Sequence, residues 1–338
     1  MKIAIDAMGG GSTPHPIVEG VVQAAGLVQE GTEILLVGQK AIIEKNLQSR
    51  FMPRGLPISV VHAPEVVAMD ETPAIALRKK RDSSIMVAVD LVKTGRADAI
   101  VSAGNTGAIM AAALVELGRL EGVSRPAIAS FFPTERDTAV VLDVGANASC
   151  KALHLYQFGV MGSTYASYIL RRRRPKVGLL SIGEESSKGN EPTILAHQML
   201  SQSSLNFVGN IEGRDILRGN VDVVVCEGFV GNVMLKFAES IDGLLTAQLK
   251  RYVMARLRYR LGTHLLMPAL LAFRRELDYA EYGGAPLLGV NGACIICHGG
   301  SSARAIRNAI AVAQQMVKAD VNSGIRRQLQ ENGEMSNE

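Results

Sequence analysis

Short apolar runs rich in β-branched residues alternate with alanine- and leucine-rich stretches along most of the chain. Several runs, such as Ala139–Leu142 and Val223–Val225, contain no polar residue. Such runs are typical of parallel strands that are buried on both faces. The alternation therefore predicts βαβ units in an α/β fold with a doubly wound, mostly parallel sheet. The expected strands are Lys2–Asp6, Glu33–Val37, Ile58–His62, Ala97–Ser102, Thr138–Asp143, Lys176–Ser181, Val221–Cys226 and Ala293–His298.

The length of 338 residues and the hydrophobic content of 47% are enough for a large packed core. We expect residues 1–320 to form a single α/β catalytic unit. No apolar periodicity is visible after Asn322, so we expect residues 321–338 to be a flexible tail.

The composition also excludes several classes of function. The net charge is only +4, tryptophan is absent and aromatic residues make up 4%, which argues against a nucleic-acid partner. No apolar run approaches the roughly 18 residues that a membrane span needs. With no signal sequence and only four cysteines, the chain is expected to be cytoplasmic with reduced thiols.

Glycine and polar residues follow six of the expected strands, at the edge where open parallel sheets bind ligands. Free amides and helix N-termini at such junctions are suited to an anion. At any one junction an ordinary turn with a helix cap is the simpler interpretation, but six of them favour a ligand crevice. The strings are Asp6–Gly11, Ser102–Gly107, Asp143–Asn147, Ser181–Asn190, Glu227–Asn232 and Cys297–Ser302.

Taken in order, these strings resemble the bacterial phosphate acyltransferase family, the acyl-acyl-carrier-protein:phosphate transacylases. The resemblance runs from Met1 to about Val317, and it includes Ile3–Gly10 and Tyr282–Gly289. One departure is Gly11, where the family usually has Asp.

This resemblance implies transfer of a fatty acyl group from acyl-acyl-carrier protein to inorganic phosphate. The product, acyl phosphate, feeds phosphatidic acid and phospholipid synthesis. The resemblance also implies a fold like that of phosphotransacetylases and isopropylmalate-type dehydrogenases, a homodimer, and peripheral association with the inner face of the cell membrane. A glycerol-3-phosphate acyltransferase of the same pathway would be a further partner.

The residues fit this chemistry without a catalytic triad, because phosphate is already an oxygen nucleophile near neutral pH. Positioning and electrostatic stabilisation then supply most of the catalysis. The strand-end strings contain no nucleophile–base pair, so we expect no covalent acyl-enzyme, and we expect neither a metal nor a cofactor.

Four residues are the candidates for catalysis. Asn105 and Asn232 lie at strand-to-helix junctions and would donate amide hydrogen bonds to phosphate or to the carbonyl oxygen. Lys188, in a glycine- and serine-rich loop, would be the phosphate cation, or else an ordinary solvated lysine. His298 would protonate the leaving thiolate, or else be held in strand-end hydrogen bonds. The expected substrate-binding residues are Asp6, Gly9, Gly10, Thr106, Gly107, Asn147, Asn190, Glu227, Gly228 and Ser301.

Three basic segments suggest interaction surfaces. Arg78–Arg81 and Arg171–Arg174 would each steer an acidic carrier protein or else be solvated helix ends. Residues 245–280 are expected to form a basic, amphipathic helical hairpin insert, with Pro268 starting its second helix. This insert would lie on a membrane surface, pack in the dimer, or do both.

Two alternative functions stay open. One is a phosphotransacylase that uses short acyl-coenzyme A, for which a basic apolar insert would be superfluous. The other is a catalytically silent membrane scaffold for lipid-synthesis enzymes, which Gly11 alone suggests.

Overall fold

The computed structural model describes residues 1–10, 14–28, 31–48, 55–254, 256–277 and 282–335. Within these residues, eleven strands form one sheet in the order β3-β2-β1-β4-β11-β10-β5-β6-β9-β7-β8. The strands are β1 (Lys2–Asp6), β2 (Glu33–Gly38), β3 (Ile58–His62), β4 (Ala99–Ser102), β5 (Ala127–Pro133), β6 (Thr138–Leu142), β7 (Lys176–Leu180), β8 (Asn206–Ile211), β9 (Val223–Val225), β10 (Ala285–Leu288) and β11 (Ala293–Ile296).

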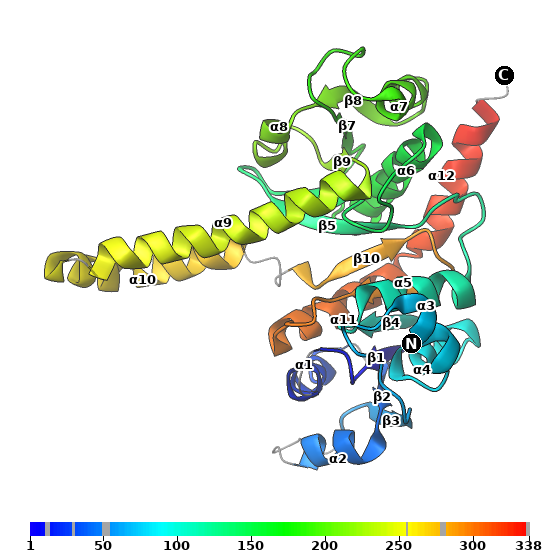
Figure 1. Ribbon diagram of the computed structural model, residues 1–338, viewed down its shortest axis with the longest axis vertical. Helices are drawn as coiled ribbons and strands as arrows, with labels where there is room; N and C mark the ends of the chain where they lie inside the picture. Colours follow the sequence, from blue (N-terminus) through cyan, green and yellow to red (C-terminus); the bar gives the residue numbers. More distant parts are fainter. Residues whose placement is uncertain (11–13, 29–30, 49–54, 255, 278–281, 336–338) are drawn as a thin grey trace.

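The sheet consists of two parallel blocks joined by two antiparallel strands. Strands β3, β2, β1, β4 and β11 run parallel to one another, and so do β6, β9, β7 and β8. Between the blocks, β10 is antiparallel to β11 and β5, and β5 is antiparallel to β6. We call the blocks with their helices the N-terminal lobe and the C-terminal lobe; they are the lower and upper parts of Figure 1.

Helices cover both faces of the sheet, and this confirms the predicted α/β fold. The buried residues of α1, α6, α7 and α11 belong to one hydrophobic core, and those of α3, α4, α5 and α8 belong to a second core on the opposite face. The helices are α1 (His15–Ala25), α2 (Lys40–Gln48), α3 (Pro73–Lys79), α4 (Ser84–Lys93), α5 (Thr106–Ala112), α6 (Ala152–Tyr168), α7 (Glu191–Ser201), α8 (Gly213–Leu217), α9 (Gly228–Met254), α10 (Leu257–Leu277), α11 (Ala303–Lys318) and α12 (Val321–Met335), with a π-helical turn at Ala113–Leu117.

Three strands, β5, β8 and β10, were not among those expected from the sequence. The strand β10 is only four residues long and contains Pro286, which cannot donate to a neighbouring strand. It forms because β11 and β5 flank it on both sides. Long-range pairing of this kind overrides the local preference of the segment.

The expectation of a flexible tail after residue 320 is wrong for residues 321–335, which form α12. This helix packs against α6, and Val321 and Ile325 are fully buried. The side chain of Asn332 is also buried, and its Oδ1 accepts hydrogen bonds from the backbone and hydroxyl of Ser204. The apolar residues of α12 are too few and too widely spaced to stand out in the sequence. Residues 336–338 lie outside the described part of the chain.

The expected insert at residues 245–280 is part of a longer helical pair. The helix α9 begins at Gly228, shortly after strand β9, and continues to Met254. It runs side by side with α10, and the pair projects away from both lobes (Figure 1). Pro268 lies inside α10 and does not start a helix as expected. No described helix is long and apolar enough to cross a membrane.

Candidate active site

A cavity of about 290 Å³, which we call the central pocket, receives residues from both lobes. Its apolar lining comes largely from β5, β11 and the first turns of α9. Its polar lining comes from helix N-termini, strand ends and α9. A mostly apolar cavity with a few convergent polar groups is the usual form of a small-molecule site. The apolar residues include Ile128, Phe131, Val144, Leu235, Ala285 and Ile296; the polar ones include Thr106, Asn232, Lys236, Glu239, His298 and Ser301.

Glycines allow the strand-end loops of the N-terminal lobe to touch one another. A Cβ atom on Gly9 would lie 2.5 Å from the backbone nitrogen of Gly104, so a side chain cannot fit there. Gly10 has a φ of +92°, and a Cβ on it would lie 3.0 Å from the carbonyl oxygen of Gly299. Gly9 and Gly10 therefore pack the loops after β1, β4 and β11 together. Gly11 lies outside the described residues.

The carboxyl group of Asp6 lies beneath these loops. It is buried and accepts hydrogen bonds from the Ser102 hydroxyl at 2.6 Å and from the backbone amides of Met8 and Gly9, both at 3.1 Å. Burial raises the pKa of Asp6, and these hydrogen bonds oppose that rise. The structure thus places Asp6 where it holds the loop after β1, and it does not line the central pocket.

Asn105 caps α5, and its amide group is fully engaged. Its Oδ1 accepts from the backbone amide of Ala108, and its Nδ2 lies within 2.9–3.2 Å of the carbonyl oxygens of Ala68, Met69 and Glu71. These contacts match the helix-cap interpretation of Asn105, since they leave no amide hydrogen directed at the pocket.

The next residue along, Thr106, lines the pocket. Beside it, Gly107 is required by close packing, because a Cβ there would lie 2.6 Å from Cγ of Pro73.

His298 and Ser301 bring the end of β11 to the pocket. The imidazole of His298 is exposed, and its Nδ1 accepts a hydrogen bond from the backbone amide of Gly300 at 3.0 Å. That bond orients the ring and leaves Nε2 as the nitrogen that carries a proton when the ring is neutral. The helix cap of α11 is Ser302, whose hydroxyl accepts from Ala305, so Ser301 is not used as a cap.

In the C-terminal lobe, Asp143 has a role like that of Asp6. The carboxyl group of Asp143 is fully buried and accepts backbone hydrogen bonds from Ile128, Gly145, Ala146 and Asn147. Burial raises its pKa. Asn147 is held by the same carboxyl group and by the carbonyl oxygen of Pro126, so its amide stabilises the loop after β6. Asp143 was not among the expected site residues, although it ends the expected strand Thr138–Asp143 and begins the strand-end string Asp143–Asn147.

The first turns of α9 form one wall of the pocket. Gly228 lets the helix begin against the loop after β6, because a Cβ there would lie 2.5 Å from the carbonyl oxygen of Asn147. Further along α9, three residues at i, i+4 and i+7 spacing lie on one face of the helix and line the pocket: Asn232, Lys236 and Glu239. The ammonium group of Lys236 lies 2.8 Å from Oε2 of Glu239. Sequence reasoning missed Lys236 and Glu239, although their spacing from Asn232 on a helix would have indicated them.

Two of the remaining expected residues line a second cavity, of about 530 Å³, within the C-terminal lobe. Asn190 and Glu227 line it together with Ser181 and Gly189. Asn190 caps α7, with its Oδ1 accepting from the backbone amide and hydroxyl of Thr193. Lys188 is exposed in this loop and is not among the residues that line either cavity. Of the six strand-end strings, three line only the central pocket and Ser181–Asn190 lines only the second cavity. Glu227–Asn232 contributes to both cavities, whereas the described residues of Asp6–Gly11 line neither, so the six strings do not share one crevice.

The cysteines near these cavities are poor nucleophiles. Burial raises the pKa of Cys297, which lines the central pocket, to about 12, and it raises the pKa of Cys226 at the second cavity still further. Such thiols are protonated near neutral pH, and thiolates are the reactive form. In the described part of the chain, no group of three or more His, Cys, Asp or Glu side chains is arranged to hold a metal ion.

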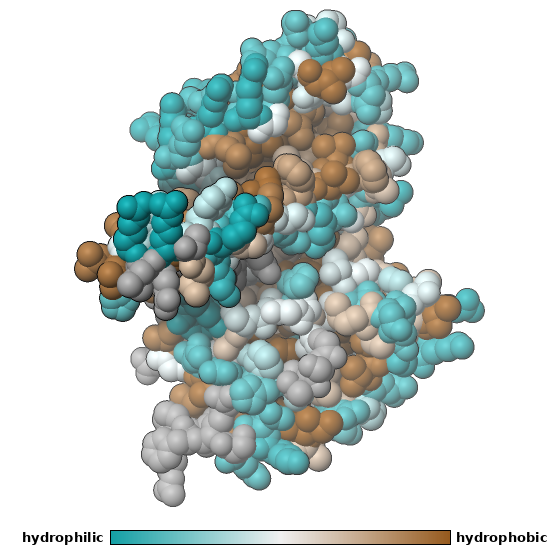
Figure 2. All heavy atoms as spheres, turned by 60° about the vertical axis from the view of Figure 1, so that its left-hand side comes forward, coloured by the Kyte–Doolittle hydropathy of each residue, from teal (hydrophilic) through white to brown (hydrophobic). Residues whose placement is uncertain are grey.

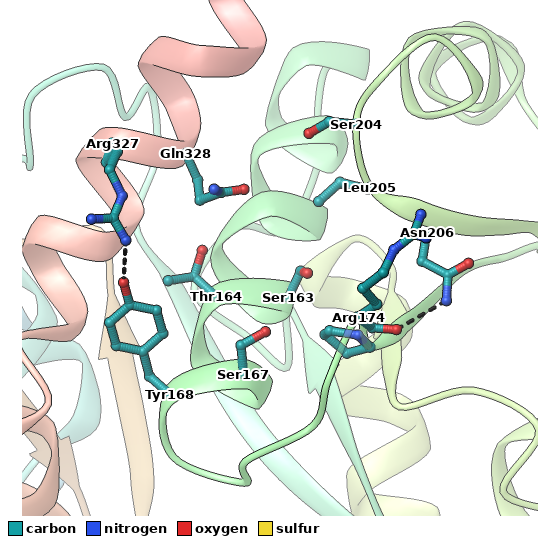
Figure 3. A pocket seen from close by; sticks show the side chains of 11 residues that line it. Ser163, Thr164, Ser167, Tyr168, Arg174, Ser204, Leu205, Asn206, Arg327 and Gln328 are labelled. Carbon is teal, nitrogen blue, oxygen red and sulfur yellow. Dashed lines mark hydrogen bonds between the residues drawn. The ribbon is translucent and has the colours of Figure 1, made fainter.

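A third cavity, of about 210 Å³, lies between α6 and α12 and is strongly polar (Figure 3). Its lining includes Arg174, Arg327 and the hydroxyl groups of Ser163 and Ser167. Arg327 donates a 2.6 Å hydrogen bond to the hydroxyl of Tyr168. None of the expected site residues lines this cavity, so the central pocket is the better candidate for the chemistry.

Comparison with known proteins identifies close relatives over nearly the whole chain. Residues 1–324 match the family model described as a fatty acid synthesis protein. The phosphate acyltransferase of Pelotomaculum thermopropionicum is 54% identical over 318 residues, which cover 94% of this chain and 92% of that protein. The phosphate acyltransferase of Desulforamulus reducens is 52% identical over 331 residues, which cover 98% of each chain.

Solved structures with a similar fold are more distant in sequence. The EutD phosphotransacetylase from Staphylococcus aureus has a TM-score of 0.61 at 17% identity, covering 93% of this chain and 94% of its own. A phosphotransacetylase from Streptococcus pyogenes has a TM-score of 0.58 at 21% identity, covering 95% of this chain and 94% of its own. At these identities the likeness establishes the fold alone.

Proposed function

Because the chain belongs to the fatty acid synthesis protein family and its relatives are phosphate acyltransferases, it is an acyltransferase, and we propose that its acyl donor is acyl-acyl-carrier protein. The acceptor is inorganic phosphate, and the product is an acyl phosphate for phospholipid synthesis. The observation that carries this proposal is the central pocket, in which an apolar lining meets a cation, an amide and an imidazole.

The size of the pocket suits a fatty acyl chain better than an acetyl group. A cavity of 150 Å³ holds a benzene ring, so 290 Å³ has room for roughly a dozen carbon atoms. The apolar residues Ile128, Phe131 and Leu235 would contact the chain. This apolar lining disfavours the alternative of a transacylase for short acyl-coenzyme A, whose acyl group needs little apolar surface.

The reaction can be written with these residues. An oxygen of phosphate attacks the thioester carbon, a C–O bond forms, and the C–S bond then breaks to release a thiolate. Lys236 and Asn232 would hold the phosphate beside the carbonyl group, which converts a bimolecular encounter into a positioned one. Nε2–H of His298 would donate the proton that the leaving thiolate takes up. An alkyl thiol has a pKa of about 8.5, so this assistance need only be modest.

Lys188 stays a second proposal for the phosphate cation. The described residues give its ammonium group no ion pair, so it is available to a ligand. Its neighbours Gly189 and Asn190 line the second cavity. Lys236 has the stronger support, because it lines the same pocket as Asn232 and His298.

The α9–α10 pair supports a membrane-associated role for the enzyme. Leu249, Tyr252, Leu261, Leu265 and Phe273 are each at least half exposed on it. Brown, hydrophobic atoms lie beside teal, hydrophilic ones on the projecting pair in Figure 2. Exposed apolar residues flanked by arginines are typical of helices that lie in a membrane interface. We infer peripheral binding to the inner membrane face of a cytoplasmic enzyme, where an acyl phosphate would partition.

We further propose that the protein is a homodimer. The N-terminal turns of α9 carry an exposed apolar row made of Phe229, Val233 and Phe237. A second copy of the chain would cover this row. A glycerol-3-phosphate acyltransferase of the same pathway would take the product from the membrane surface.

The decisive experiment supplies purified protein with phosphate and either acyl-acyl-carrier protein or acyl-coenzyme A, and measures acyl phosphate. We expect turnover with the long-chain carrier-protein donor. Turnover only with short acyl-coenzyme A would favour the alternative donor, and no turnover with any donor would favour a silent scaffold.

A further inference from the structure

The segment Ala68–Pro73, which we call the rim segment, packs against the loops after β4 and β11, two loops that contribute residues to the central pocket. Asn105, next to the pocket-lining Thr106, donates hydrogen bonds to three carbonyl groups of this segment. At one end Pro73 packs on Gly107, and in the middle Met69 packs on Gly299, which follows His298. The rim segment is thus fixed beside two of the polar loops that line the pocket.

The basic run Arg78–Arg81 follows the rim segment through the short helix α3. Lys80 turns inward: its ammonium group lies 2.5 Å from Oε1 of Glu71 and donates to the carbonyl oxygen of Val66 at 2.7 Å. This pairing lowers the pKa of Glu71 and fastens the run to the rim segment.

The other three cations of the run point outward. Arg78, Lys79 and Arg81 are exposed, and none of them forms an ion pair with a described residue. Arg78 and Lys79 lie five and six residues after Pro73 in α3, so they are about 8–9 Å along the helix axis from it, and Arg81 lies just beyond the end of the helix. Two large apolar side chains are exposed on the same stretch: Met69 is 48% exposed and Ile75 is 53% exposed.

The second basic run, Arg171–Arg174, has different surroundings. Arg172 pairs with Asp137 and Asp222, which neutralise it. The run precedes β7, so it lies at the start of the C-terminal strands, whereas the pocket lies at their ends. Its last residue, Arg174, lines the separate polar cavity between α6 and α12 (Figure 3).

The structure therefore assigns the docking of the acyl donor to one of the two runs: Met69, Ile75, Arg78, Lys79 and Arg81 form the surface that binds an acidic carrier domain. This inference rests on the proposed function, in which a carrier protein delivers the thioester. Unpaired cations around a small apolar centre complement an acidic protein and speed its encounter with the enzyme. Their position beside the rim segment lets the carrier's thioester arm enter the central pocket directly.

The test compares charge reversal at the two runs. The variant Arg78→Glu/Lys79→Glu changes the proposed surface, and Arg171→Glu/Arg173→Glu is the matched control at the other run. Each is assayed with acyl-acyl-carrier protein and with an acyl-pantetheine thioester that lacks the carrier domain. We expect the first variant to lose on the order of tenfold or more in kcat/KM with the carrier protein, and to lose its salt dependence. The control should keep both, and neither variant should change turnover of the small thioester.

The outcomes separate this inference from the proposed function. If the unchanged enzyme makes no acyl phosphate from the carrier-protein donor, the proposed function fails. If that enzyme is active and both variants lose equally, or the first variant loses nothing, the docking surface is elsewhere. A loss with both donors also overturns the inference, because it means that the charges act on the pocket. Arg78→Ala/Lys79→Ala should give a smaller loss in the same direction.

Discussion

Replacing Lys236 with alanine tests the pocket most directly. Its ammonium group would contact the phosphate dianion, and a hydrogen bond to a charged group contributes about 1.5–3 kcal/mol. The side chain is 55% exposed, so solvent screening places the effect at the lower end of that range. A loss of about 1.5 kcal/mol corresponds to roughly a tenfold weaker affinity. We therefore expect Lys236→Ala to raise the KM for phosphate about tenfold and to leave the KM for the acyl donor nearly unchanged.

Two further variants sharpen this prediction. Glu239→Gln removes the negative charge that lies 2.8 Å from Lys236, so the phosphate KM should fall. Lys188→Ala, measured in the same assay, compares the two candidate cations. The assignment is refuted if Lys236→Ala leaves phosphate dependence within about twofold of the unchanged enzyme while Lys188→Ala weakens it.

Three other predictions follow from the burial or exposure of particular groups. Cys297, with a pKa of about 12, is a thiolate in about one molecule in ten thousand at pH 8, so iodoacetamide should label it slowly below pH 10. The variant Cys297→Ser should stay active, and an acyl adduct on Cys297 during turnover would contradict the mechanism. Asp143→Ala leaves the buried backbone amide of Ile128 without its hydrogen-bond acceptor, so it should lower the free energy of unfolding by about 1–3 kcal/mol in urea titrations. An unchanged urea midpoint would show that the loop after β6 needs no carboxylate. Polar replacement of the exposed leucines Leu265, Leu266 and Leu271 should release the protein from anionic vesicles in a co-sedimentation assay, without changing turnover of soluble substrates. Conversion of this variant to monomers would show that the three leucines serve the dimer.

The sequence predicted the parallel blocks because their signal is local. The interior of strands such as β1 and β9 is buried on both faces, and this requires consecutive apolar side chains, here Ile3–Ile5 and Val223–Val225. The strands that join the lobes carry no such signal. Ser130 in β5 and Pro286 in β10 interrupt their apolar patterns, and these strands are defined by partners far away in the chain. The boundary between the lobes, and so the position of the pocket, could not be read from the sequence.

The expected site residues divide for a similar reason. A strand-end polar residue either faces a ligand or holds its own loop, and the sequence motif is the same in both cases. The side-chain amides of Asn105 and Asn147 donate their hydrogen bonds to backbone carbonyl groups and, for Asn147, also to Asp143. Asn232 and His298, in contrast, line the central pocket. Only the path of the neighbouring segments decides between these roles. In the case of Asn105, that segment is Ala68–Glu71, more than thirty residues away.

The helix α9 crosses the expected boundary at residue 245 and connects the central pocket to the projecting helical pair. The sequence changes character there, because basic residues and exposed leucines become frequent. The backbone does not change: one helix runs from Gly228 to Met254, about 40 Å at 1.5 Å per residue. One end of this helix presents Asn232 and Lys236 to the central pocket, and the other end presents Tyr252 on the projecting pair. A continuous helix therefore fixes the distance between the pocket and the apolar surface that we propose to bind the membrane. In the membrane-bound state that we propose, an acyl phosphate formed in the central pocket would be released within about the length of this helix from the lipid phase into which its chain partitions.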